Sequence, residues 1–160
     1  MPPLSDAISG VYETHMSVAD LPRSIAFYRE ALGLTLAREI PARGVAFFWV
    51  GGPQQGMLGL WQGGSGPLRM TGHFAFRTAR DAVLTAPATF STLGLAPLGF
   101  HGEPITEAVV IGWMPAVTVY LKDPDGHSIE FLHLLSDPPD EAFGIGPWSA
   151  WLAHRKAHPA

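Results

Sequence analysis

Apolar positions in the first part of the chain change from an alternating spacing to a helical one. Residues 11–18 alternate and include β-branched and aromatic types, which predicts a strand. Asp20 can then cap a helix whose apolar residues recur every three to four positions, and Gly33 supplies its end. Two apolar runs follow, at 45–52 and 56–62, and predict two further strands. The first part therefore reads as strand, helix and strands.

The second part of the chain repeats this layout. It begins with a predicted strand at 72–78 and a helix at 80–93, which Pro87 is expected to disturb. Both helical segments end on Leu-Gly-Leu. Three more strands are predicted, the last two separated by the strong turn signal Asp-Pro-Asp-Gly, at 109–113, 116–122 and 128–134. Each half thus approximates a β-α-β-β-β unit, and the predicted fold class is α+β.

The repeat also predicts the domain organisation. We expect one domain over 1–160, made of module one at 11–62, module two at 72–135 and a tail at 136–160. A Gly-rich linker at 63–69 joins the modules, and the tail begins Pro-rich and ends in a short helical segment with Trp148 and Trp151.

Polar residues occupy matching places in the two halves. Superposing the halves sets His73 against Glu13 and sets Glu130 against Gly59. His15 lies two residues beyond Glu13, on the same face if this segment is a strand. Three of the four matching positions therefore carry side chains that can bind a metal ion. A shared site explains this recurrence better than chance does.

Composition narrows the function classes. Hydrophobic residues make up 47% of the chain and charged residues 15%, which excludes broad disorder. The net charge of −4 and the absence of a Lys/Arg run argue against nucleic-acid binding. Without cysteine there is no disulfide, thiolate metal site or cysteine nucleophile. No signal peptide or membrane-length apolar run is visible, so we expect a soluble, cytoplasmic protein with no membrane partner.

Three motifs resemble the vicinal oxygen chelate superfamily, which includes glyoxalase I, extradiol dioxygenases and bleomycin-resistance proteins. They are VADLPRSIAFYREALGL (18–34), GHFAF (72–76) and YLKDPDGHSIEFL (120–132). The resemblance implies two paired βαβββ modules whose sheets curl into a cup with a divalent metal at its floor. It also implies a small-molecule substrate and a homodimer, for which a tail carrying Trp148 and Trp151 could serve as a clasp or a lid.

The resemblance assigns a role to each matching position. Glu13 takes the first ligand position, His73 the third and Glu130 the fourth. The second position, often Glu in glyoxalases, is Gly59 here, which weakens a strict glyoxalase assignment. Imidazole and carboxylate ligands without sulfur suit Mn, Fe, Co, Ni or Zn.

Two metal-dependent chemistries remain open from the residues. A lyase or isomerase of glyoxalase type, such as a lactoylglutathione lyase, needs a base beside a carbonyl, for which Glu130 or Glu13 is the candidate. A ring-cleaving dioxygenase needs Fe(II) and a 2-His-1-carboxylate set, which His15 would complete with His73 and Glu130. His15 could instead act as a catalytic acid or base beside the metal. The alternative function is a non-catalytic drug-binding protein of the bleomycin-resistance type.

The strands indicate the kind of substrate. Residues 45–62 and 109–121 contain no Lys or Arg, which disfavours phosphonates, phosphates and CoA esters and favours a small apolar or aromatic molecule with adjacent oxygens. Glu103 and Glu107 fall in a predicted loop that could close over the site. We expect His127, in the turn after DPDG, to be solvated.

Overall fold

The computed structural model describes residues 10–53, 55–63 and 71–158 and divides the chain into two compact units, 1–71 and 72–160. Each unit is built around one sheet. The predicted linker at 63–69 lies almost wholly outside the described residues, as does the first part of the N-terminal segment.

Unit 1 contains a four-stranded sheet in the order β1-β4-β3-β2, with β1 parallel to β4 and the other pairs antiparallel. In chain order its elements are β1 (Glu13–Val18), α1 (Leu21–Ala26), a π-helical turn (Phe27–Ala31), β2 (Thr35–Ile40), a 3₁₀ turn (Pro41–Arg43), β3 (Val45–Trp49) and β4 (Met57–Gln62). The order agrees with the approximate β-α-β-β-β unit, although the sequence pattern located only two of the three strands after the helix.

The helix of unit 1 starts where the sequence predicts. The Asp20 carboxylate accepts a hydrogen bond from the Arg23 backbone N–H at 2.9 Å, which satisfies one of the free donors of the first turn. Gly33, at a φ of 69°, ends the helical segment in the left-handed conformation that glycine adopts at little cost. The helix packs on β3 and β4, with Tyr28 and Phe48 fully buried between the layers.

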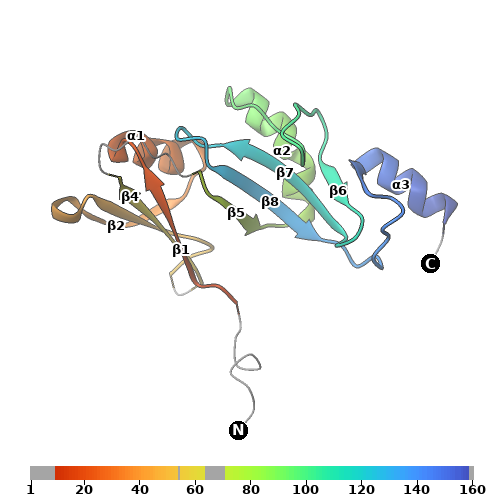
Figure 1. Ribbon diagram of the computed structural model, residues 1–160, viewed down its shortest axis with the longest axis horizontal. Helices are drawn as coiled ribbons and strands as arrows, with labels where there is room; N and C mark the ends of the chain where they lie inside the picture. The colour runs from red at the N-terminus through yellow and green to blue at the C-terminus, as the bar shows by residue number, and fades with distance from the viewer. Residues whose placement is uncertain (1–9, 54, 64–70, 159–160) are drawn as a thin grey trace, which may run out of the picture. The chain divides into compact units, whose positions relative to one another are not determined.

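Unit 2 contains a five-stranded sheet in the order β5-β8-β7-β6-β9, with β5 parallel to β8 (Figure 1). Its elements are β5 (His73–Arg77), α2 (Arg80–Thr92), β6 (Val109–Ile111), β7 (Ala116–Lys122), β8 (Ser128–Leu134), β9 (Ile145–Pro147) and α3 (Trp148–Ala157). Helix α2 covers one face of β7 and β8, where Val83 and Phe90 are buried. The opposite face of these strands carries the site.

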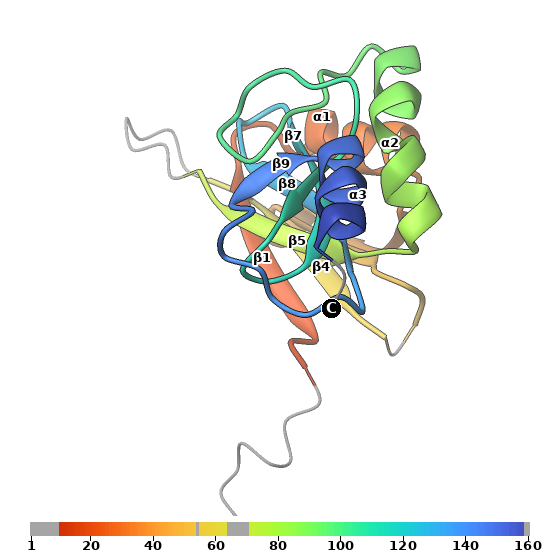
Figure 2. The same cartoon turned by 90° about the vertical axis from the view of Figure 1, so that its right-hand side faces the viewer.

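The tail completes the sheet of unit 2. Strand β9 pairs with β6, and α3 packs beside both of them (Figure 2). Trp151 is only 1% exposed and packs against Phe143, with the Arg155 guanidinium over its ring. Because its surface is used within unit 2, Trp151 is not free to act as a clasp or a lid.

The structure departs from the sequence prediction in three elements. Strand β2 was not predicted, because Thr35–Ile40 is a half-exposed edge strand with two charged residues. Strand β9 was not predicted either, since its three residues include Gly146 and Pro147. Helix α2 runs unbroken through Pro87, which is buried.

Among the residues that the structure describes, no helix combines the length and apolar character needed to cross a membrane.

Candidate metal and substrate site

Unit 1 presents a carboxylate and an imidazole side by side on one strand. Glu13 and His15 project from the same face of β1, with His15 Nε2 2.8 Å from Glu13 Oε1. The alternate residues Met16 and Val18 are buried on the other face, toward α1. The pair follows from β-strand periodicity, which the sequence pattern already contained.

Trp61 fixes the protonation pattern of His15. The indole Nε1–H can only donate, and it lies 2.7 Å from His15 Nδ1, so Nδ1 is the unprotonated nitrogen. In the neutral ring Nε2 then carries the proton and donates a hydrogen bond to the Glu13 carboxylate. The Arg43 guanidinium lies over the Trp61 ring, 4.8 Å from its centroid, and holds the indole in place. His15 is thereby arranged as a donor to Glu13.

Gly59 makes room for this arrangement. It lies opposite His15 in the β1–β4 register, and a Cβ at position 59 would meet both His15 Cδ2 and Phe47 Cε1 at 3.2 Å. The imidazole of His15 thus covers the place from which a side chain at position 59 would project. A histidine from the neighbouring strand thus occupies the space that a side chain at this position would fill.

Unit 2 holds its own pair, formed across two strands. Glu130 on β8 is 5% exposed, and its Oε1 accepts hydrogen bonds from Thr118 Oγ1 at 2.6 Å and from the Tyr120 hydroxyl at 2.8 Å. These two donors offset the cost of burying a carboxylate. Burial, together with the hydrogen bond and the charge of Glu130, raises the pKa of the Tyr120 hydroxyl well above its usual range. Tyr120 therefore stays protonated as a donor.

His73 has the opposite tautomer to His15. Its Nδ1 lies 3.2 Å from the Ser128 carbonyl oxygen, which can only accept, so Nδ1 carries the proton. Nε2 lies 3.3 Å from Glu130 Oε2. This contact is favourable when Nε2 also carries a proton and pairs with the carboxylate, or when both atoms bind one metal ion. Metal-binding histidines commonly donate their second N–H to a backbone carbonyl in this way.

The strand registers show which positions of unit 1 and unit 2 correspond to each other. Gly59 is opposite His15 in β1–β4, and Glu130 is opposite Ala75 in β5–β8. Glu13 and His73 each lie two residues before these partners. Glu13 therefore matches His73, Gly59 matches Glu130, and His15 stands where unit 2 has alanine.

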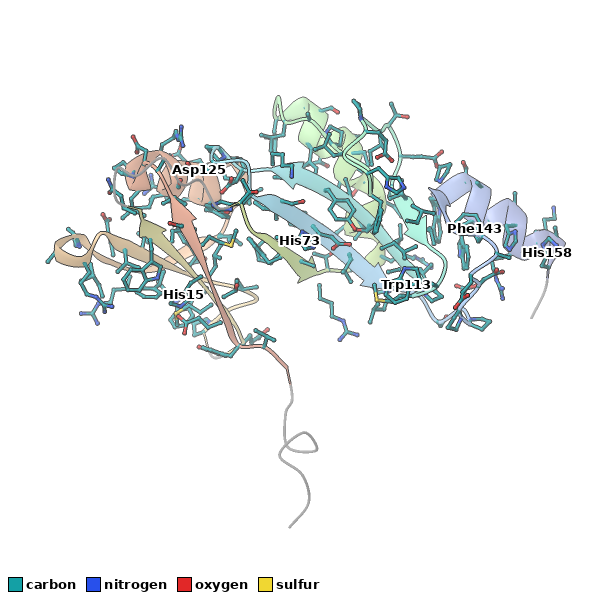
Figure 3. All side chains as sticks on the ribbon, viewed as in Figure 1. His15, His73, Trp113, Asp125, Phe143 and His158 are labelled. Atoms are coloured by element: carbon teal, nitrogen blue, oxygen red, sulfur yellow. The ribbon has the colours of Figure 1, made fainter. Side chains whose placement is uncertain are left out.

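The donor sets of the two units fit a divalent ion of the Mn-to-Zn series, because they consist of imidazole nitrogen and carboxylate oxygen. Over the described residues, no group of three or more His, Asp or Glu side chains is arranged to hold such an ion. Each unit holds one pair of its own, on β1 in unit 1 and across β5 and β8 in unit 2; Figure 3 labels His15 and His73.

Other residues considered from the sequence have structural roles. Glu103 accepts a hydrogen bond from the His101 N–H within its own loop, and Glu107 binds both the N–H and the hydroxyl of Ser149 at the start of α3. The expectation for His127 is wrong, because it is 2% exposed and its Nδ1 accepts from the Gly72 N–H at 2.8 Å. DPDG forms a hydrogen-bonded turn that folds this histidine inward.

Comparison with known families agrees with this architecture. The model of the Glyoxalase/Bleomycin resistance protein/Dioxygenase superfamily matches residues 11–131, which is most of the 160-residue chain. The protein therefore belongs to this superfamily, and the α+β fold with two βαβββ sheets is the fold predicted from the sequence.

Solved structures with this fold differ in their described activities. An integron cassette protein from the mobile metagenome of a Halifax Harbour sewage outfall is 29% identical, with a TM-score of 0.67, covering 79% of this chain and 100% of its own. The lactoylglutathione lyase of Agrobacterium tumefaciens is 24% identical, with a TM-score of 0.59 and coverage of 83% and 96%. The oxidase ChaP-H2 is 19% identical, with a TM-score of 0.62 and coverage of 82% and 98%. The last two show the fold alone. No curated protein matches the chain.

Proposed function

We propose that this protein is a metal-dependent enzyme of the lyase or isomerase type that acts on a small substrate with two neighbouring oxygens. The observation that carries the proposal is the His73–Glu130 pair. His73 Nε2 lies 3.3 Å from Glu130 Oε2, His73 Nδ1 is bound to a backbone carbonyl, and two donors bind the other oxygen of the Glu130 carboxylate. This arrangement suits two ligands of one cation.

Glu13 is the proposed third ligand, with His15 as the residue that orients it. The Trp61 hydrogen bond supports this choice over ligation by His15, because it uses the Nδ1 lone pair and places the proton on Nε2. The proposed set is therefore Glu13, His73 and Glu130. The ligands come from one chain or, in a homodimer, from two copies.

This set favours lyase or isomerase chemistry over ring cleavage. With His15 as a donor, one histidine and two carboxylates remain, rather than the 2-His-1-carboxylate set of non-haem iron oxygenases. When bound, the metal would polarise a substrate oxygen and stabilise a developing enolate. In this proposal Glu130 is the candidate base, and Tyr120 and Thr118 hold its carboxylate in position. His15 orients the Glu13 carboxylate through its Nε2–H.

Metal content of protein purified without chelator or affinity nickel tests the proposal, measured by mass spectrometry. We expect near-stoichiometric metal in the wild type and loss of it in Glu130→Gln and His73→Gln, whose side chains keep similar volumes. His15→Gln should retain the metal, because it removes a donor to the ligand and no ligand.

The outcomes separate the candidate functions. If His15→Gln also loses the metal, His15 is a ligand and the 2-His-1-carboxylate set is the better interpretation. The activity assay would then use iron and catechol substrates. A wild-type protein that holds no metal and takes up none would contradict the enzyme proposal and favour the drug-binding alternative.

A further inference from the structure

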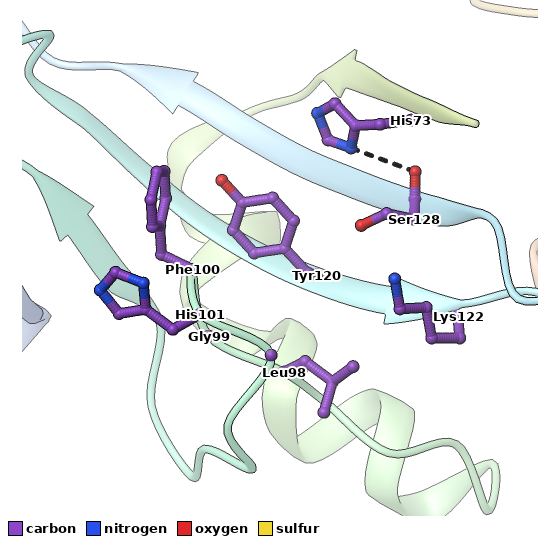
Figure 4. Close-up of a pocket in the computed structure, with 9 residues that line it drawn as sticks. His73, Leu98, Gly99, Phe100, His101, Tyr120, Lys122 and Ser128 are labelled. Carbon is purple, nitrogen blue, oxygen red and sulfur yellow. Dashed lines mark hydrogen bonds between the residues drawn. The ribbon is translucent and has the colours of Figure 1, made fainter. Parts of the chain in front are cut away.

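Unit 2 contains a pocket of about 430 Å³ beside His73, within the range of small-molecule sites (Figure 4). It lies on the sheet face that carries Glu130 and is bounded on one side by the loop at 98–102. Among the residues that line it are His73, Phe100, Tyr120, Lys122 and Ser128.

Two unpartnered polar groups stand together at one end of the pocket. Register places His73 opposite Ser128 and Ser128 opposite Lys122, so the three side chains form a row across β5, β8 and β7 (Figure 4). Within the described part of the chain, neither the Lys122 ammonium nor the Ser128 hydroxyl forms a hydrogen bond or an ion pair through its side chain. Residues 109–121 contain no Lys or Arg, and Lys122 follows directly after that range.

The other end of the pocket is aromatic. Phe100 meets Tyr120 edge to face, with ring centroids 6.2 Å apart, and the Phe100 side chain is 41% exposed. Backbone pairing of Leu98 with Tyr120 fixes the loop to β7, with N···O distances of 2.8 and 2.9 Å. The aromatic wall is therefore held on the same strand as the cation.

We propose that this pocket binds substrates that carry one carboxylate and an aromatic or bulky apolar body. The carboxylate accepts hydrogen bonds from Lys122 and Ser128, and the body packs against Phe100 and Tyr120. Tyr120 and Lys122 are two residues apart on β7, about 6.7 Å, a span that an arylacetic acid covers. This inference rests on the proposed function, because it takes the pocket beside His73 to be that of the substrate.

The single ammonium group of Lys122 determines which class of anion this end of the pocket can bind. One charge-assisted hydrogen bond with a neighbouring hydroxyl matches a monocarboxylate. A phosphate or pyrophosphate would leave most of its charge without a partner, because the other groups at this end are a serine hydroxyl and an imidazole.

The two lysines of the chain, Lys122 and Lys156, allow a direct test. Reductive methylation with ¹³C-formaldehyde keeps the ammonium charge and labels both lysines, which the variants Lys122→Met and Lys156→Met assign by NMR. Chelator-treated protein is titrated with phenylacetate and with phenylacetamide, which share a ring and differ in charge. Calorimetry gives the affinities of the unlabelled variants.

We expect phenylacetate to shift the Lys122 signal and not the Lys156 signal, and phenylacetamide to shift neither. Lys122→Met should weaken phenylacetate binding about tenfold and change phenylacetamide binding less than twofold, as loss of one charge-assisted hydrogen bond predicts. Lys156→Met, the matched control, should change neither affinity.

Equal binding of the acid and the amide, equal effects of the two lysine variants, or no binding of either probe would overturn the inference. Because the titration is done without metal, its result is independent of the metal measurement above. If the protein binds metal but does not prefer phenylacetate to phenylacetamide, only the carboxylate inference is contradicted. If it prefers phenylacetate but binds no metal, only the proposed enzyme function is contradicted.

Discussion

The contact between His15 and Gly59 gives the most specific prediction about unit 1. In Gly59→Ala the new Cβ would lie 3.2 Å from His15 Cδ2 and 3.2 Å from Phe47 Cε1. Favourable carbon–carbon contacts are about 3.5–4.0 Å long, so both rings must move by a few tenths of an ångström. The movement of His15 also stretches its hydrogen bonds to Trp61 and Glu13.

The magnitude follows from two opposing contributions. Overpacking costs about 1–3 kcal/mol, and a value near the middle applies, because two rings must move although the His15 side chain is 43% exposed and can shift. Replacing glycine in a strand by alanine returns about 0.5–1 kcal/mol of backbone entropy. We therefore expect Gly59→Ala to destabilise the wild type by about 1 kcal/mol. In a His15→Ala background the contact with the imidazole is gone and the change should be close to neutral.

Urea unfolding followed by circular dichroism measures this double-mutant cycle. The backbone contribution is the same in both backgrounds, as is the Phe47 contact, so the coupling energy isolates the His15 ring. We expect a coupling of about 1 kcal/mol. A coupling below about 0.3 kcal/mol, within the additivity of independent sites, would refute the placement of His15 over Gly59.

Three further predictions concern single groups. Tyr120→Phe removes a hydrogen bond to a buried carboxylate and should lower the free energy of unfolding by about 1.5–3 kcal/mol, measured in urea, whereas Tyr12→Phe, at a 46% exposed position, should change it by less than about 0.5 kcal/mol. Asp20→Ala removes a helix cap and should cost about 1 kcal/mol in the same assay. A hydrogen bond from His154 on α3 lowers the pKa of the Asp140 carboxyl below its ordinary 3.8. The ionised Asp140 therefore stabilises the folded protein above pH 3.8, and this contribution to the free energy of unfolding is lost as the pH falls through the lowered pKa. The difference in urea midpoint between wild type and Asp140→Asn should therefore shrink as the pH falls below 4; a difference that persists at pH 2 would contradict this.

The sequence predicted the parts of the fold that depend on local pattern. The strands that became β1, β4, β5, β7 and β8 alternate or are continuously apolar, and Asp20 and Gly33 mark the ends of the first helical segment. The pairing of Glu13 with His15 also followed, because strand periodicity alone puts them on one face.

What the sequence could not supply depends on contacts between distant segments. The tautomer of His15 is set by Trp61, 46 residues away, and that of His73 by a backbone carbonyl 55 residues away. His127 is buried because its ring accepts a hydrogen bond from Gly72, which no pattern around DPDG reveals. Lys122 lies at the end of an apolar strand, and only register shows that it shares a row with His73.

The two His–carboxylate pairs differ in when they can exist during folding. Glu13 and His15 belong to a three-residue segment, so they stay within reach of each other in the unfolded chain. His73 and Glu130 meet only after β5 has closed a long loop onto β8, because His73 and Ser128, its partner in that register, are 55 residues apart. An ion that needs the second pair is therefore bound by the folded unit 2 and adds its binding free energy to the stability of that unit. The first pair, present before and after folding, contributes no such linkage by itself.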